Sequence, residues 1–226
     1  MNKTKLWTKD FIMLSIINFL TFLIHFLLFV TIASYAVTEF HAVTSQAGLV
    51  AGIFIIGALF GRLGTGSIIE DLGNRKVLIA GAVVFIVTSA LYYAAVNLTL
   101  LIIFRLLHGM AFGIMTTAVG TIIAKVIPAH RRGEGIGYYS MGAILAVALG
   151  PFIGIILIQY MSFKMIFIFT TILAIISFAI SFFIDEPAME SSAHKQEKVM
   201  KRMRLANFLE FKAIPISIII LIIGFS

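Results

Sequence analysis

A few polar side chains interrupt the long apolar stretches of this sequence. Asn18, Thr21 and His25 are spaced at i, i+3 and i+7, which places them on one face of a helix. Further along, Arg105 and His108 stand three residues apart within another apolar run. An imidazole exchanges protons near neutral pH, and an arginine inside a bilayer must be solvated or paired. These five residues are therefore candidates for binding a proton or a polar solute within a membrane.

The same residues also have a purely structural interpretation. A single histidine in an apolar helix often serves only as a hydrogen-bonded packing residue, and Arg105 can snorkel or hold a structural hydrogen-bond network. Asp and Glu occur only at the ends of the apolar runs or in loops, and Cys is absent. The sequence therefore predicts no catalytic residue, no metal site and no cofactor.

The composition identifies the environment of the chain. Hydrophobic residues make up 61% of its 226 residues and charged residues 12%, and the mean hydropathy is +1.09. Soluble domains have about 45–50% apolar and about 25% charged residues. Lipid must solvate much of this chain, which excludes a soluble globular enzyme and a disordered chain. The net charge is +7, but the basic residues separate apolar runs, so nucleic acid is not an expected partner.

Six apolar runs approach or exceed the roughly 20 residues that a membrane-spanning helix needs. The predicted spans are Phe11–Ala36, Ala47–Ile69, Val77–Ala95, Leu98–Ala124, Gly135–Tyr160 and Met165–Ile184. A seventh run, Ala213–Ser226, is shorter than a bilayer requires. We therefore expect an all-α membrane protein with an amino terminus (1–10), a six-helix transmembrane bundle (11–184), a linker (185–212) and the start of a seventh helix (213–226).

The basic residues predict the orientation of the bundle. Of the 17 Lys and Arg residues, all but Arg105 and Lys164 fall on one side of the predicted spans. Lys and Arg in short loops stay in the cytoplasm. We therefore expect a multi-pass protein of the cell membrane with a cytoplasmic amino terminus. The linker 185–212 either lies on the inner leaflet as an amphipathic helix or is solvated.

The connection between the second and third spans carries a spaced pattern of glycines and charges. A sharp turn between antiparallel spans needs a glycine, which accepts left-handed dihedral angles. The pattern resembles the signature loop between helices two and three of the major facilitator superfamily, although Asp71 stands where that family usually has a basic residue. The resemblance implies a gating loop on the cytoplasmic side, formed by Gly66, Glu70, Asp71, Gly73, Arg75 and Lys76.

The fourth span resembles the same family. Arg105 and Gly109 match the family's pattern of an arginine followed by a glycine, and His108 takes a position that often holds Gln. The resemblance implies that Arg105 takes part in proton coupling.

The fifth span carries a packing stripe of small residues at four-residue spacing. Such spacing lets two helices approach closely in lipid, and a proline bends the helix. The Gly-Pro-x-x-Gly stretch resembles the fifth-helix signature of the drug–proton antiporters of the superfamily. The resemblance implies a helix-packing hinge toward another half, formed by Gly142, Ala146, Gly150, Pro151 and Gly154.

The resemblance covers roughly residues 10–184 and implies the first six helices of a twelve-helix transporter, built as two inverted three-helix repeats. It implies proton-coupled efflux of a small molecule by alternating access. Asn18, Thr21 and His25 would line the cavity, and Arg105 and His108 would couple protons or contact the substrate. Because no span holds an Asp or Glu, a neutral or anionic substrate is favoured.

Alternatives to efflux remain open at this stage. A proton-driven importer, of a sugar for example, would use the same architecture, and a truncated membrane interaction protein would not transport at all. The short seventh run leads us to expect that a carboxy-terminal half or a second copy of the chain completes the cavity. The expected partners are thus a small-molecule substrate, protons, the lipid bilayer and that second half.

Overall fold

The computed structural model describes residues 5–185, without the side chains of Ser67 and Glu70. Within that range the chain is helical and has no β-strand. The predicted seventh helix and all of the linker except Asp185 lie outside the described residues. The helices are α1 (Lys9–Phe40), α2 (Thr44–Leu72), α3 (Asn74–Leu91), α4 (Leu98–Val126), α5 (Arg132–Tyr160) and α6 (Phe163–Ser181), with 3-10 turns η1 (Tyr92–Ala94) and η2 (Ala129–Arg131).

All six of these α-helices are long and apolar enough to cross a bilayer, which confirms the six predicted spans. Several of their ends differ from the prediction by a few residues. α1 begins early since the Thr8 hydroxyl accepts a hydrogen bond from the Phe11 amide at 3.2 Å. α4 begins where predicted, with Asn97 capping the Leu100 amide at 2.9 Å. Hydropathy locates the apolar centre of a span and leaves its capped ends undefined.

The connection between α2 and α3 is a single residue. α2 continues past Gly66 to Leu72, so Gly66 lies within the helix and not in the turn. Gly73 alone makes the turn, with φ 85° and ψ 151°, and its amide donates to the Ile69 carbonyl at 3.1 Å. This conformation is almost confined to glycine. The sequence analysis was correct that the turn needs a glycine.

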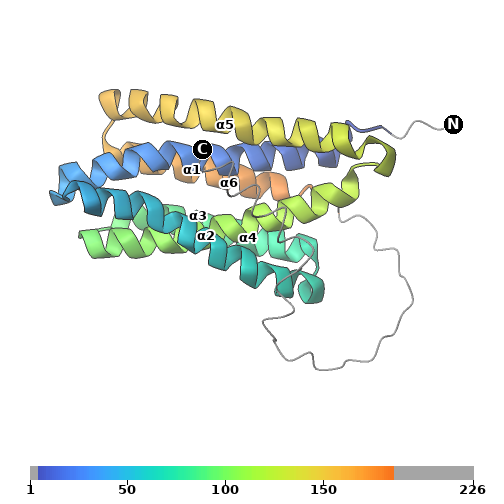
Figure 1. Ribbon diagram of the computed structural model, residues 1–226, viewed down its shortest axis with the longest axis horizontal. Helices are drawn as coiled ribbons and strands as arrows, with labels where there is room; N and C mark the ends of the chain where they lie inside the picture. The colour runs from blue at the N-terminus through green and yellow to red at the C-terminus, as the bar shows by residue number, and fades with distance from the viewer. Residues whose placement is uncertain (1–4, 186–226) are drawn as a thin grey trace, which may run out of the picture. The chain divides into compact units, whose positions relative to one another are not determined.

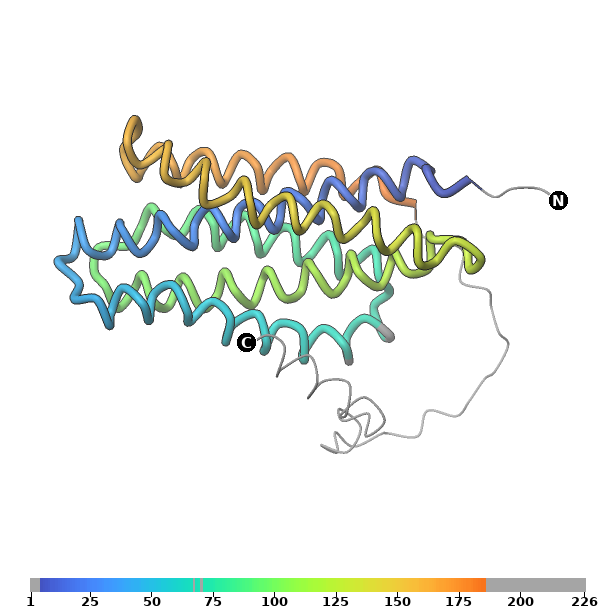
Figure 2. The backbone as a smooth tube through the Cα atoms, turned by 45° about the horizontal axis from the view of Figure 1, so that its top comes forward, coloured from blue at the N-terminus to red at the C-terminus, as the bar shows by residue number. Residues whose placement is uncertain are grey.

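Two long helix pairs dominate the packing. α1 lies along α5, and α2 lies along α4 (Figure 1). In a repeat of three helices, α1, α2 and α3 correspond to α4, α5 and α6. The contact between α1 and α5 then corresponds to the contact between α4 and α2. The tube through the backbone shows the same two pairs side by side from a second direction (Figure 2). The bundle is therefore built from two inverted three-helix repeats, as half of a major facilitator fold is.

Glycines at four-residue spacing bring α2 and α4 into backbone contact. A Cβ atom on Gly57 would overlap the Leu106 carbonyl oxygen, and one on Gly61 would overlap that of Met110. Gly109 of α4 meets the Phe54 carbonyl oxygen in the same way. Because small residues let helices approach closely in lipid, this interface tolerates no side chain at these positions.

The packing stripe of α5 faces α1. A Cβ atom on Gly150 would lie 2.6 Å from Phe26 Cβ and 2.9 Å from the Leu27 nitrogen. One on Gly154 would lie 3.0 Å from the Leu27 carbonyl oxygen, and Ala146 is fully buried. Pro151 is inside the helix. The close contacts of this stripe therefore lie within the bundle, and its role as a hinge toward another half stays a prediction.

Both ends of the bundle's chain meet on one side of it. Lys9, at the start of α1, lies 3.9 Å from the carboxylate of Asp185, which follows α6. Arg75, at the start of α3, donates to the Phe182 carbonyl oxygen at 2.9 Å. An even number of spans requires this arrangement. It places the gating loop at the same end of the bundle as the first residues of α1.

Gly61→Ala tests the close approach of α2 and α4. The added methyl group must push the two backbones apart, and overpacking of this kind costs about 1–3 kcal/mol. We expect a lower melting temperature of the purified protein in detergent, followed as the monodisperse fraction that survives heating. Gly52→Ala is the matched control, because a Cβ atom at Gly52 of the same helix meets nothing within 4 Å. Equal melting temperatures for both variants would contradict the proposed interface.

Gly73→Ala tests the turn between α2 and α3. A residue with a Cβ atom is strained at φ 85°, at a cost of about 1–3 kcal/mol. We expect this variant to melt below the wild type in the same assay. Gly66→Ala should melt at or above the wild-type temperature, since Gly66 is helical and its surroundings are open. Loss of stability in Gly66→Ala alone would show that the turn had been placed wrongly.

Candidate functional site

A cavity of about 350 Å³ opens between α1, α2 and α4. Its wall combines aromatic rings with two basic side chains, His25 and Arg62. Phe54 contributes to the wall and is itself almost fully buried. The residues that line the cavity are Phe22, His25, Phe26, Phe54, Ile55, Ile56, Ala58, Leu59, Arg62 and Phe112.

His25 is held in this wall by aromatic contacts. Its imidazole stacks on the Phe54 ring with centroids 4.2 Å apart and planes 16° apart. Phe26 and Phe112 lie 4.7 Å and 5.2 Å from the imidazole centroid. The Nδ1 atom is buried and has no hydrogen-bond partner among the described residues. The aromatic contacts therefore fix the plane of the imidazole ring, while its Nδ1 atom has no hydrogen-bond partner among the described residues. That atom is a candidate for binding a proton or a polar group of a solute.

Arg105 lies behind the cavity wall and is fully buried. Its guanidinium carbon is 4.4 Å from the centroid of Phe54, a cation–π distance. One nitrogen, Nη1, donates to the Tyr92 hydroxyl at 3.5 Å, while Nε and Nη2 have no partner among the described residues. The ion pairs found in residues 5–185 join Lys9 to Asp185 and Arg131 to Glu134, so neither involves this arginine. Phe54 therefore contacts both Arg105 and His25.

The hydrogen bonds around His108 run in a single direction. Ser89 has one hydroxyl hydrogen, which it donates to the Phe85 carbonyl oxygen at 2.8 Å. The Ser89 oxygen must then accept from His108 Nε2 at 3.2 Å, which leaves Nδ1 as an acceptor. Tyr92 donates to that Nδ1 at 2.9 Å and accepts from Arg105. The network assigns His108 as the neutral Nε2–H tautomer and connects it to Arg105 through Tyr92.

The structure separates the polar stripe that the sequence places on one face of α1. Asn18 is buried and pairs with Tyr139 of α5, accepting from its hydroxyl at 3.0 Å and donating to its carbonyl oxygen at 3.4 Å. Thr21 is buried and donates to the Ile17 carbonyl oxygen at 2.7 Å. Of the three residues, His25 alone lines the cavity. Asn18 instead joins α1 to α5.

The gating loop is divided between a helix end, a turn and a helix start. Asp71 is exposed in the last turn of α2, and Lys76 is exposed in the first turn of α3. Arg75 reaches the end of α6, as described above. The side chain of Glu70 lies outside the described residues. The gating function of this loop stays a prediction.

Several residues of the site escaped the sequence analysis. Tyr92 and Ser89 fix both predicted residues of α4, and Phe54 carries the contact between His25 and Arg105. A signal for the first two existed, because hydroxyl side chains near the end of an apolar run need partners. Phe54 gave no such signal, since a phenylalanine in a span is indistinguishable from any other apolar residue.

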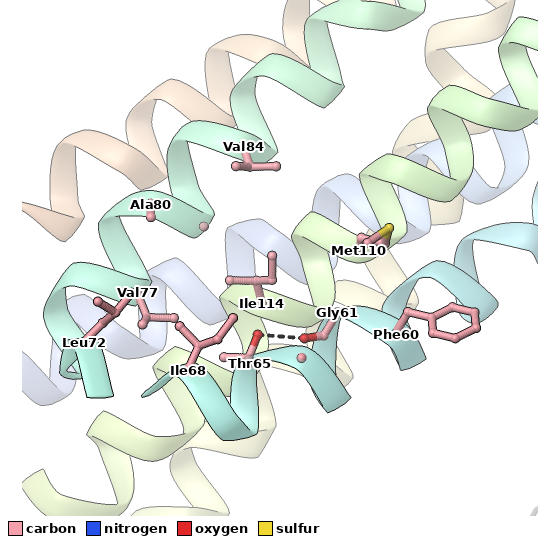
Figure 3. A pocket seen from close by; sticks show the side chains of 12 residues that line it. Phe60, Gly61, Thr65, Ile68, Leu72, Val77, Ala80, Val84, Met110 and Ile114 are labelled. Carbon is pink, nitrogen blue, oxygen red and sulfur yellow. Dashed lines mark hydrogen bonds between the residues drawn. The ribbon is translucent and has the colours of Figure 1, made fainter. Parts of the chain in front are cut away.

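A second cavity, of about 300 Å³, lies between α2, α3 and α4 (Figure 3). Its wall is almost entirely apolar. Its one hydroxyl group, that of Thr65, donates to the Gly61 carbonyl oxygen at 2.7 Å, the bond drawn dashed in Figure 3. With no free polar group to orient a solute, this cavity is a weaker candidate than the one beside His25.

Six membrane-length helices in two inverted repeats, the arrangement of half a transporter fold, define a multi-pass membrane protein of the transporter type. The sequence model of the Major Facilitator Superfamily matches residues 14–226. The chain belongs to this superfamily, whose members are membrane transporters rather than enzymes.

Similar proteins agree with this assignment. The chain is 26% identical over 183 residues to the quinolone resistance protein NorA of Staphylococcus aureus (strain MRSA252). The matched region covers 80% of this chain and 47% of NorA. It is 29% identical over 179 residues to the facilitated trehalose transporter Tret1 of Drosophila willistoni, which covers 77% of this chain and 20% of Tret1.

A solved structure shares the fold. The crystal structure of a bacterial homologue of the human lysosomal transporter Spinster superposes with a TM-score of 0.60 at 19% identity, which covers 88% of this chain and 47% of that one. The chain therefore spans about half the length of NorA and of the Spinster homologue.

Tyr92→Phe tests the directed network. The variant leaves His108 Nδ1 without its donor and removes the hydrogen bond of Arg105, and an unsatisfied buried group costs about 1–3 kcal/mol. We expect a lower melting temperature in detergent. Tyr93→Phe is the control, because Tyr93 is the next residue and its side chain is exposed. If both variants melt together, Tyr92 packs through its ring alone and the network carries no stability.

Proposed function

We propose that the chain forms one half of a proton-coupled exporter of small molecules that works by alternating access. The two halves of such a fold rock about a site between them. The cavity between α1, α2 and α4 would be this half's wall of that site. Arg105 and His108 would couple protons or contact the substrate, and His25 would line the cavity. The gating loop would close the cytoplasmic side, which requires the cytoplasmic amino terminus that the basic residues predict.

The buried guanidinium of Arg105 carries this proposal. An arginine in the middle of a bilayer costs several kcal/mol unless it is paired or solvated, so such residues usually serve a function. Here two of its nitrogens have no partner among the described residues, although its ring neighbour Phe54 lines a cavity. A purely structural arginine would be expected to satisfy all of its donors. Both donors are buried behind the cavity wall, so a substrate, a water molecule or a group of another half would reach them only when that wall moves.

The direction of transport rests on the relatives and on the fifth-helix motif. NorA is named for resistance to quinolones, which favours export, and the Gly-Pro-x-x-Gly motif favours the same subgroup. Tret1 is named as a facilitated trehalose transporter, which keeps uptake of a sugar as the alternative. Both relatives suggest a small-molecule substrate.

Arg105→Ala tests the coupling role. The protein is reconstituted into liposomes with an acidic interior, and the accumulation of the fluorescent quinolone norfloxacin is followed. We expect wild-type protein to accumulate the probe and Arg105→Ala to lose at least tenfold in initial rate, because the buried positive charge is gone. Insertion into the liposomes should be unchanged.

Two further measurements complete this experiment. Lys164→Ala removes an exposed charge at the start of α6 and should retain the wild-type rate within twofold. Arg105→Lys keeps the positive charge but loses the planar guanidinium. Partial activity of this variant would show that coupling depends on the charge, and no activity would show that it depends on the geometry of the guanidinium. Transport that survives in Arg105→Ala would refute the coupling role, and accumulation of trehalose under an acidic exterior would favour the importer.

A further inference from the structure

The basic groups near the cavity are not matched by acids. Arg62 and His25 line the cavity, and Arg105 contacts its wall through Phe54. The acidic residues whose side chains the structure describes lie at the ends of the bundle. Asp10 and Glu134 are in first turns, Glu39 and Asp71 are in last turns, and Asp185 follows α6. Among the described side chains, which do not include that of Glu70, neither arginine has an ion-pair partner.

This imbalance sets the sign of the potential inside the cavity. Charges in a low-dielectric environment interact over long distances, because little water screens them. His25 and Arg105 contact the same phenyl ring, at 4.2 Å and 4.4 Å from its centroid. A cation entering the cavity would be repelled by Arg62 and by the guanidinium behind Phe54. An anion would supply the charge that these groups lack.

The rest of the wall selects for a flat ring. Phe22 and Phe112 pack edge to face with centroids 5.1 Å apart, and Phe54 and Phe112 are at the same distance. Phe54 and Phe112 are almost fully buried in this packing, whereas Phe22 and Phe26 also line the cavity and are only partly buried, so their rings are the ones open to a planar group. Aromatic groups gain energy from such contacts beyond the burial of their area.

We infer that the cavity between α1, α2 and α4 binds small aromatic anions, with a carboxylate or similar group toward Arg62 and His25 and the ring against the phenylalanines. The inference rests on the proposed function, because it names the substrate class of the same site. It departs from an exporter of cationic compounds, which would need an acid in this wall.

A matched set of naphthalene probes tests the inference. The purified 226-residue chain in lipid nanodiscs is titrated by calorimetry with 2-naphthoate, 2-naphthylmethanol and 2-naphthylmethylammonium at neutral pH. These probes share the ring and differ in charge. We expect the anion to bind at least tenfold more tightly than the cation, with the alcohol between them. The saturated counterpart 2-decalincarboxylate should bind several-fold more weakly than 2-naphthoate.

Arg62→Gln identifies the cavity as the binding site. Arg62 is exposed to the cavity and has no ion-pair partner among the described residues, so the substitution leaves the fold intact. We expect about a tenfold loss for 2-naphthoate and less than twofold for 2-naphthylmethanol. Lys164→Gln removes the same charge outside the cavity and should change neither affinity.

The outcomes separate this inference from the proposed function. Equal or tighter binding of the ammonium probe, an unchanged anion affinity in Arg62→Gln, or no binding of any probe would overturn the inference. Selective binding of 2-naphthoate, with no gradient-driven accumulation of norfloxacin or of 2-naphthoate itself, would uphold the substrate class and refute transport. Accumulation of norfloxacin that depends on Arg105, together with no preference for the anionic probe, would uphold proton-coupled transport and refute the proposed substrate class.

Discussion

The burial of one guanidinium group determines much of this bundle's arrangement. Arg105 is fully buried in a membrane-spanning helix, where desolvation of its charge costs several kcal/mol. No carboxylate among the side chains that the structure describes pairs with it, so the compensation seen there comes from the Phe54 ring and the Tyr92 hydroxyl. Both partners belong to other elements, α2 and η1. The position of these elements around α4 is thus coupled to the charge that α4 carries.

The glycines of the α2–α4 interface make that compensation geometrically possible. Gly109 is one turn beyond Arg105, and it brings α4 against the Phe54 backbone. The close backbone contact at Gly109, which leaves no room for a side chain, therefore also holds the Phe54 ring against the guanidinium of Arg105. A wider separation of the two helices would weaken the cation–π contact, which falls off within about 6 Å. The close packing of α2 against α4 and the cation–π contact of Arg105 thus both depend on the glycines of this interface.

The sequence predicted the parts of this structure that depend on the bilayer and failed where contacts between helices decide. Hydropathy was sufficient for six spans because each must cross the same apolar layer. The turn glycine was predictable, but only the structure shows that Gly73 rather than Gly66 makes it. Asn18, Thr21 and His25 share one face of α1. However, Asn18 accepts a hydrogen bond from Tyr139, and Thr21 donates to a backbone carbonyl oxygen of its own helix. Periodicity gives the face of a helix but not the neighbour that the face meets.

The direction of the hydrogen bonds links the two predicted residues of α4. In the network as described, His108 Nδ1 accepts from Tyr92, and Tyr92 accepts from Arg105. A proton on Nδ1 would turn this acceptor into a donor, so the Tyr92 hydroxyl would have to turn its hydrogen toward another acceptor. The hydroxyl oxygen would then have to accept from His108 Nδ1 and from Arg105 at once, which brings two positive charges to one acceptor. Protonation of His108 and the pairing of Arg105 are therefore not independent, and a change at either residue reaches Phe54 and the cavity wall.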